Sequence, residues 1–124
     1  MKEIIESIIN WNKIAENNSF NKSLEMSMLS EEFSETILSI KNKDKKETLD
    51  WVLDMFIIGI WTLHKMGFNS EQISTALETI MENNYSKFQY DTQWNHICIK
   101  DENWKIMKPE WFKPVDISDI IPNS

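Results

Sequence analysis

Hydrophobic side chains recur along the first ninety residues at the three- and four-residue steps of helices. Clusters of asparagine, serine and lysine separate four such segments, and these residue types favour caps and turns. The pattern predicts helices over about residues 2–16, 22–40, 46–66 and 71–84. Gly67 stands where a left-handed residue should end the third helix, and Asn69 or Ser70 is expected to cap the fourth.

The chain changes character after Phe88. Residues 89–124 contain three tryptophans and all three prolines, and they show no helical period and no internal repeat. Residues 97–106 carry a weak hairpin signal, with two short strands around Asp101-Glu102-Asn103. We therefore expect one all-α domain over residues 1–124, with a four-helix core over about 2–88. An irregular or hairpin tail over 89–124 should pack on the helices or on a partner subunit.

Charge and composition narrow the function classes. The formal net charge is −7, and all thirteen basic residues are lysine. Sequence-specific DNA binding favours arginine and a basic face, so we expect no nucleic-acid partner. The single cysteine, Cys98, excludes an intramolecular disulfide. The N-terminus lacks a secretory pattern, and the apolar run from Trp51 to Leu63 is interrupted and too short for a bilayer. These features predict a cytoplasmic protein with no membrane partner.

Acidic residues lie at helical spacing on the second segment. Glu32 and Glu35 fall on neighbouring turns of one face. This face borders an apolar stripe that is expected to line the core, made of Leu29, Phe33, Thr36, Ile37 and Ile40. The two carboxylates should therefore lie at the rim of the core. Acids at helical spacing are most often ordinary surface residues, and that interpretation competes with a functional one.

The third segment gives a sharper signal at Asp54. This residue lies in an apolar run from Trp51 to Ile58, and a helix that is hydrophobic all round is expected to be buried. A buried carboxylate must be protonated, paired with a cation or bound to a metal. Because Asp50 and other acids are expected nearby, a divalent ion is the favoured solution. Carboxylate oxygens select Mg²⁺, Mn²⁺ or Ca²⁺ over zinc.

Three motifs together resemble a known family. They are Glu31-Glu32-Phe33-Ser34-Glu35, the acidic helix from Asp50 to Gly59, and Asn84-Tyr85-Ser86-Lys87-Phe88. The set resembles the MazG-like, all-α nucleoside triphosphate pyrophosphohydrolases, and most closely their phosphoribosyl-ATP pyrophosphohydrolase-like branch. Segments 101–109 and 114–117 are similar to the end of those proteins, so the resemblance covers roughly residues 20–121.

The resemblance implies a metal-dependent hydrolase. Its reaction would be Mg²⁺-dependent hydrolysis between the α and β phosphates of a nucleotide, with Mn²⁺ as an alternative ion. The implied metal ligands are Glu32, Glu35 and Asp54, while Glu31 and Asp50 would each act as ligand or general base.

One position departs from the family pattern. Trp51 stands where many members have glutamate, so Asp50 would supply that carboxylate one position earlier. Glu47 with Asp50 also reads as the ExxD motif, and this register stays open.

The resemblance also implies substrate-binding residues and partners. Asn84 would meet sugar or base, Lys87 a phosphate, and Lys108 and less directly Lys105 would reach the site from the tail. Trp61 lies on the same helical stripe as Glu47, Asp50 and Asp54 and is the candidate for a base contact. Family members are usually dimers or tetramers with shared helices near the site, so a homo-oligomer and a nucleotide substrate are expected. The alternative is a non-catalytic oligomerisation or nucleotide-binding module with the same fold.

Overall fold

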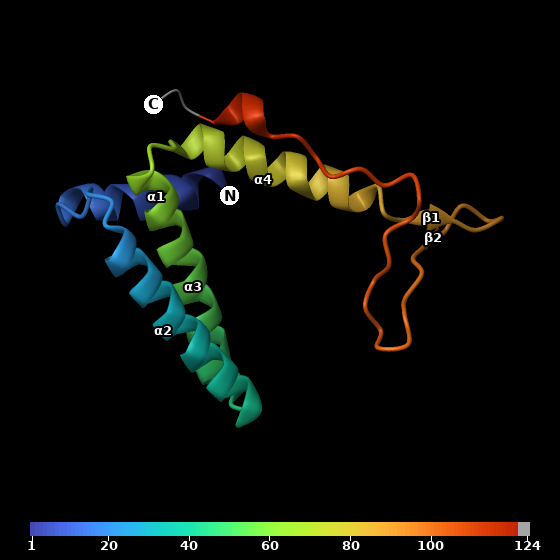
Figure 1. Cartoon of the computed structure of the whole chain (residues 1–124), viewed down its shortest axis with the longest axis horizontal. Coiled ribbons are helices and arrows are strands. Elements are labelled where there is room, and N and C mark those ends of the chain that lie inside the picture. The colour runs from blue at the N-terminus through green and yellow to red at the C-terminus, as the bar shows by residue number, and fades with distance from the viewer. Residues whose placement is uncertain (122–124) are drawn as a thin grey trace. The chain divides into compact units, whose positions relative to one another are not determined.

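The computed structural model describes residues 1–121. Within this range it has four α-helices: α1 (Lys2–Ile14), α2 (Lys22–Lys41), α3 (Lys45–Lys65) and α4 (Ser70–Tyr85). The other elements are strands β1 (Gln89–Tyr90) and β2 (His96–Ile97), which pair antiparallel, and the 3₁₀ helix η1 (Ser118–Ile120) (Figure 1). The predicted helical class is confirmed, and each helix ends within two residues of its predicted range.

Local side-chain chemistry explains these boundaries. Asn21 and Asp44 precede α2 and α3, and each accepts a hydrogen bond from the backbone N–H three residues later. Asn69 caps α4 as predicted. Its side chain accepts from the Gln72 N–H at 2.8 Å, and the Gln72 side chain accepts from the Asn69 N–H at 2.9 Å. Gly67 has φ 103° and follows α3 in the predicted left-handed conformation.

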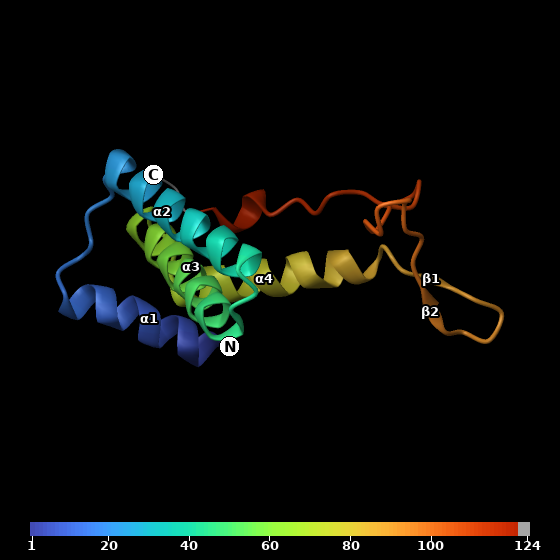
Figure 2. The same cartoon turned by 90° about the horizontal axis from the view of Figure 1, so that it is seen from below.

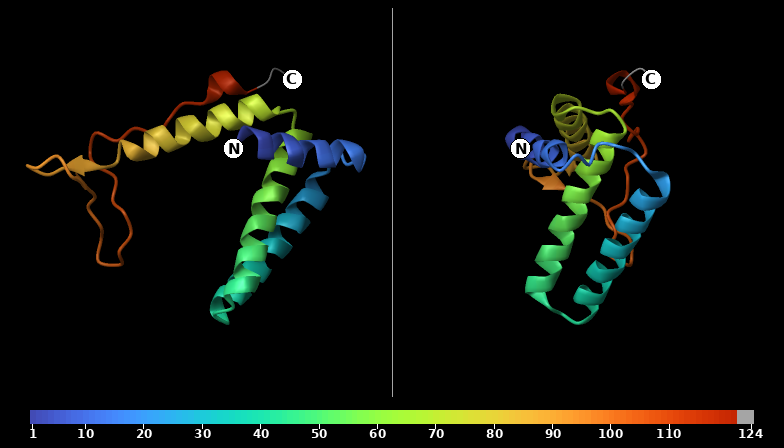
Figure 3. Two further views of the ribbon diagram at one scale, coloured as in Figure 1. Left: turned by 180° about the vertical axis from the view of Figure 1, so that it is seen from behind. Right: turned by 90° about the vertical axis from the view of Figure 1, so that its left-hand side faces the viewer.

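The chain divides into two compact parts, residues 1–74 and the residues from Thr75 on. In the first part α2 and α3 form an antiparallel hairpin, and α1 lies across the C-terminal half of α3 (Figures 2 and 3). The buried apolar core is small and consists of Ile5, Ile8, Ile9, Ile60 and Ile73. No helix among residues 1–121 is long and apolar enough to cross a membrane.

Helix α2 packs on α3 mainly through polar side chains. Glu25, Thr36 and Ser39 are buried. The Thr36 hydroxyl lies 3.3 Å from the Met55 sulfur, and the Thr48 hydroxyl lies 3.1 Å from that of Ser39. The Thr36 and Ser39 hydroxyls also donate to carbonyl groups of α2 itself, whereas Glu25 has its partners, Thr62 and Lys65, on α3. The buried Glu25 carboxylate therefore requires that this face of α2 turns toward α3.

The predicted apolar stripe of α2 is therefore only partly in the core. Thr36 is buried and Leu29 half-buried, but Phe33, Ile37 and Ile40 are 48–57% exposed. The expectation that α3 is buried all round is also wrong, because Leu49, Val52 and Leu53 are exposed. Both helices of the hairpin thus present apolar side chains outward.

The second part contains two turns with the same hydrogen bonds. In the first, Asp91 Oδ1 accepts from two backbone N–H groups, those of Gln93 and Asn95. In the second, Asp101 Oδ1 accepts in the same way from the N–H groups two and four residues later. The fourth residue of each turn is a tryptophan with positive φ, Trp94 at 62° and Trp104 at 65°.

The structure thus shows a repeated turn that the sequence pattern did not reveal. An antiparallel bridge between Lys100 and Ile106 flanks the second turn. The hairpin predicted over 97–106 is therefore present, but as this one bridge and not as two strands.

Candidate functional site

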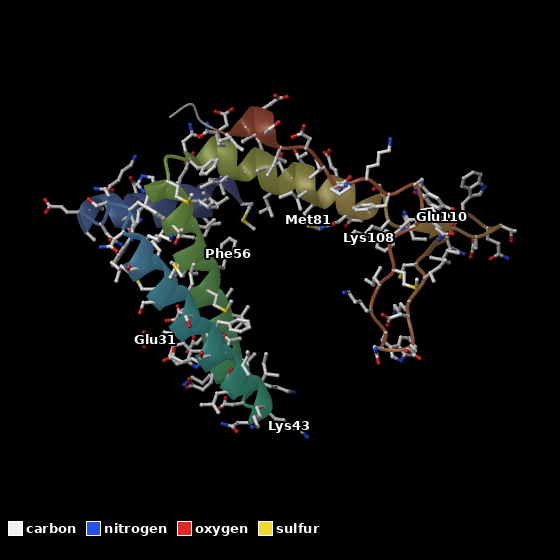
Figure 4. All side chains as sticks on the ribbon, in the orientation of Figure 1. Glu31, Lys43, Phe56, Met81, Lys108 and Glu110 are labelled. Atoms are coloured by element: carbon white, nitrogen blue, oxygen red, sulfur yellow. The ribbon has the colours of Figure 1, made fainter. Side chains whose placement is uncertain are left out.

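The acidic residues of α2 and α3 come together in the first part of the molecule. Glu32 and Glu35 on α2 and Asp54 on α3 are half-buried. Glu31, which is labelled on α2 in Figure 4, is exposed. Burial raises the pKa of the Glu32 carboxyl, and the negative charges of Glu35, Asp54 and Glu31 raise it further, in that order. Four of the five predicted acids therefore share one electrostatic environment.

Glu32 stands at the centre of this group. Its Oε2 atom is buried and has no hydrogen-bond partner among residues 1–121. A buried carboxylate oxygen without a partner is costly, because it has lost water and gained nothing in exchange. The surrounding carboxylates can only accept hydrogen bonds when ionised, so they cannot stabilise it. Its partner must be a proton, a water molecule or a cation.

The fifth predicted acid, Asp50, lies outside this environment. It is exposed and is not among the charges that raise the pKa of Glu32. Glu47, the alternative in the ExxD register, lines a pocket of about 200 Å³ at the α2–α3 turn together with Glu35 and Trp51. The structure therefore associates Glu31 with Glu32, and Glu47 with Glu35.

Asp54 departs from one expectation. It is half-buried instead of enclosed, and Val52 and Leu53, which precede it on α3, are exposed. The only ion pair among residues 1–121 joins Glu25 to Lys65, so no protein cation pairs with Asp54 there.

The acidic group has the right kind of ligand atoms for a hard divalent ion, but its side chains are not close enough together to surround one. All the donors are carboxylate oxygens, which Mg²⁺ and Mn²⁺ prefer, and one of them is buried without a partner. Among residues 1–121, no three acid, histidine or cysteine side chains are positioned to hold a metal together. Glu32, Glu35, Asp54 and Glu31 would have to converge by changes of side-chain rotamer to complete such a site.

Two predicted substrate-binding lysines meet in the second part of the molecule. The ammonium groups of Lys87 and Lys108 lie 5.2 Å and 5.6 Å from the centre of the Phe112 ring. Asn84, which precedes Lys87 in the predicted motif, is half-buried near the end of α4. Lys105, the weaker candidate, is exposed. Phe112 was not predicted, and its position next to Trp111 in an irregular segment carries no periodic signal.

Trp61, the predicted base contact, packs against the core of the first part. Its ring stacks on Trp11 with 4.9 Å between centroids, so one face of the indole is covered. Its Nε1 is buried without a hydrogen-bond partner among residues 1–121. His64, one turn later, is half-buried, and burial together with Lys13 and Lys65 lowers its pKa. A neutral packing histidine matches this environment.

Comparison with known proteins identifies no relative: no family model matches the chain, and neither a curated protein nor a solved structure matches it.

Proposed function

We propose that the chain is a Mg²⁺-dependent nucleotide pyrophosphohydrolase. It would add water across the bond between the α and β phosphates of a nucleoside triphosphate and release a nucleoside monophosphate and pyrophosphate. Such an enzyme would remove unwanted or excess nucleotides. The resemblance of Glu31–Glu35, Asp50–Gly59 and Asn84–Phe88 to the MazG-like pyrophosphohydrolases supports this assignment.

The single observation that carries the proposal is the Glu32 carboxylate. Its buried Oε2 has no hydrogen-bond partner among residues 1–121. The charges that raise the pKa of Glu32 belong to three more carboxylates, which lie on two helices. A carboxylate crowded by others in this way favours the binding of a proton or a cation, which is how acidic residues that hold a metal are arranged.

Each acid then has a proposed role. Glu32, Glu35 and Asp54 hold the metal, and Glu31, Glu47 or Asp50 completes the site as ligand or general base. A bound Mg²⁺ would neutralise phosphate charge and lower the pKa of a coordinated water. Lys87 and Lys108 would meet the phosphates, and Asn84 the sugar or base.

The exposed apolar residues of the hairpin support a homo-oligomer. Phe33, Ile37 and Ile40 on α2 and Leu49, Val52 and Leu53 on α3 are all at least 45% exposed. Soluble monomers rarely leave large contiguous apolar patches uncovered. A second copy of the chain is the proposed cover, and the helices that carry the acids would then lie at the subunit interface.

Pyrophosphate release tests the proposal directly. The purified chain would be incubated with Mg²⁺ and a panel of canonical, deoxy and modified nucleoside triphosphates, and pyrophosphate and monophosphate would be quantified together. We expect the two products in equal amounts from at least one nucleotide. An absence of pyrophosphate from every nucleotide, with Mg²⁺ or Mn²⁺, would refute the hydrolase and leave the non-catalytic module as the remaining reading.

A further inference from the structure

An aromatic pocket lies in the second part of the molecule. It has a volume of about 560 Å³ and is lined by Tyr85, Ser86, Phe88, Gln89, Tyr90 and Trp111. Small-molecule sites commonly have volumes of a few hundred to about 1,000 Å³. Three of its rings, those of Tyr85, Tyr90 and Trp111, are 55–61% exposed. Flat aromatic surface is therefore open to a ligand.

The pocket wall combines ring faces with a few polar groups. Tyr85 and Phe88 meet edge to face at 5.8 Å, which holds the two rings at a fixed angle. Gln89 supplies an amide that can both donate and accept hydrogen bonds, and Ser86 supplies a hydroxyl. A planar, partly apolar ring with a hydrogen-bonding edge matches this lining.

Two positive charges adjoin the pocket. Lys87 stands between the lining residues Ser86 and Phe88, and Phe112 directly follows the lining residue Trp111. Lys87 and Lys108 both lie over the ring of Phe112, and neither forms an ion pair with a carboxylate among residues 1–121. Two like charges held over one ring favour an anionic group beside them.

We propose that this pocket binds the base of a nucleotide while Lys87 and Lys108 bind its phosphates. The assignment rests on the proposed function in taking a nucleotide as the substrate, and it adds the place where the base is held. The base stacks on the exposed rings, of which Trp111 is the largest, and its polar edge faces Gln89. Because stacking uses the face that every base has, the pocket accepts more than one base.

Calorimetric titration of the full chain without metal tests this assignment, since no hydrolysis is expected under these conditions. The probes are ATP, GTP, CTP and UTP, the four matching nucleosides, and inorganic tripolyphosphate. We expect Trp111→Ala to weaken triphosphate and nucleoside binding by roughly tenfold or more and to leave tripolyphosphate binding intact. Lys108→Gln should weaken the triphosphates and tripolyphosphate and spare the nucleosides.

Two further variants separate base binding from a general effect on the tail. Trp104→Ala removes a tryptophan that is 77% exposed and does not line the pocket, so it should change none of the affinities. Trp111→Phe keeps an aromatic face and should restore most of the lost affinity. The assignment is overturned if no triphosphate binds, if Trp111→Ala binds like wild type, or if Trp104→Ala loses as much as Trp111→Ala.

A parallel assay with Mg²⁺ separates this assignment from the proposed hydrolase. Nucleotide binding that depends on Trp111, without any pyrophosphate release, would refute the hydrolase and keep the base pocket. Pyrophosphate release by Trp111→Ala with the KM of wild type would refute the base pocket and keep the hydrolase.

Discussion

Lys65 donates a 2.6 Å hydrogen bond to Glu25 across the α2–α3 hairpin, and both side chains are buried. The other oxygen of Glu25 accepts from the Thr62 hydroxyl at 2.9 Å, so the carboxylate has a partner on each side. The two charged residues are forty positions apart in the chain. Their pairing fixes the register of α2 on α3. This register in turn determines that Glu32 on α2 lies near Asp54 on α3.

Removing one partner of this pair should strongly destabilise the first part of the molecule. Lys65→Met leaves the Glu25 carboxylate buried and uncompensated, which costs about 3–5 kcal/mol in comparable buried pairs. Urea unfolding followed by circular dichroism measures the change. Lys46→Met, at an exposed position near the start of α3, is the matched control and should cost less than about 0.5 kcal/mol.

The double variant Glu25→Leu with Lys65→Met distinguishes a lost charge pair from lost packing. It should recover much of the stability that Lys65→Met loses, because no isolated charge remains buried. A Lys65→Met variant as stable as Lys46→Met would show that the pair does not fix the hairpin.

The raised pKa of Glu32 predicts a dependence of stability on pH. The Glu32 carboxyl binds a proton more tightly in the folded protein than in the unfolded protein, where its pKa is near the ordinary 4.5. The free energy of unfolding contributed by Glu32 is therefore highest below pH 4.5 and falls as pH rises toward the folded pKa. Glu32→Gln should be more stable than wild type at pH 7 without metal and should lose this advantage at pH 4. Equal stability curves for the two proteins from pH 4 to 7 would contradict the prediction.

Mg²⁺ should offset the destabilisation that the Glu32 carboxylate causes at pH 7. A ligand that binds only the folded state stabilises it, by about 2.7 kcal/mol at a hundred times its Kd. Thermal unfolding with and without Mg²⁺ should show a higher Tm for wild type with the ion and no response in Asp54→Asn, which would remain folded. Glu31→Gln, Glu47→Gln and Asp50→Asn, compared in the same way, identify the acid that completes the site. A full Mg²⁺ response in Asp54→Asn would exclude that residue as a ligand.

The outward apolar residues predict self-association that a charge can disrupt. Phe33→Glu, at a side chain that is 55% exposed, should shift the mass in solution toward the monomer, as measured by light scattering during gel filtration. Ser34→Glu, at the exposed neighbouring position, adds the same charge beside the stripe and should leave the mass largely unchanged. A wild-type chain that is monomeric at all concentrations would refute the homo-oligomer.

Much of the helical structure follows from local sequence, and the packing does not. The period located four helices, and Asn69 and Gly67 marked two of their ends correctly, because capping depends on a few neighbouring residues. The period of α2 identified residues that share a face, but it could not show which face meets α3. That orientation depends on the buried Glu25 finding Thr62 and Lys65, which lie 37 and 40 positions later in the chain.

The candidate site shows the same division. The EExxE spacing placed Glu32 beside Glu35 from helix geometry alone, whereas their relation to Asp54 depends on the register of two helices. The meeting of Lys87 and Lys108 over Phe112 depends on how an irregular segment folds back. No periodic pattern encodes that return.

The two repeated turns lead to a prediction about Trp94 and Trp104. Both have positive φ, a conformation that costs a bulky residue about 1–2 kcal/mol relative to glycine or asparagine, and both are more than three-quarters exposed. The Trp94 ring lies 5.9 Å from the Tyr90 ring, and Lys100 lies 5.0 Å from the Trp104 ring centre; contacts of this kind at exposed positions offset only part of the cost. Trp94→Asn and Trp104→Asn should therefore stabilise their turns by about 1 kcal/mol each.

Slower amide hydrogen exchange at the turn N–H groups of Gln93, Asn95, Asn103 and Lys105 would measure this gain. Trp111→Asn, at an exposed tryptophan without positive φ, should give no such protection, and faster exchange in the Trp94 and Trp104 variants would show that their rings stabilise the turns in the folded protein.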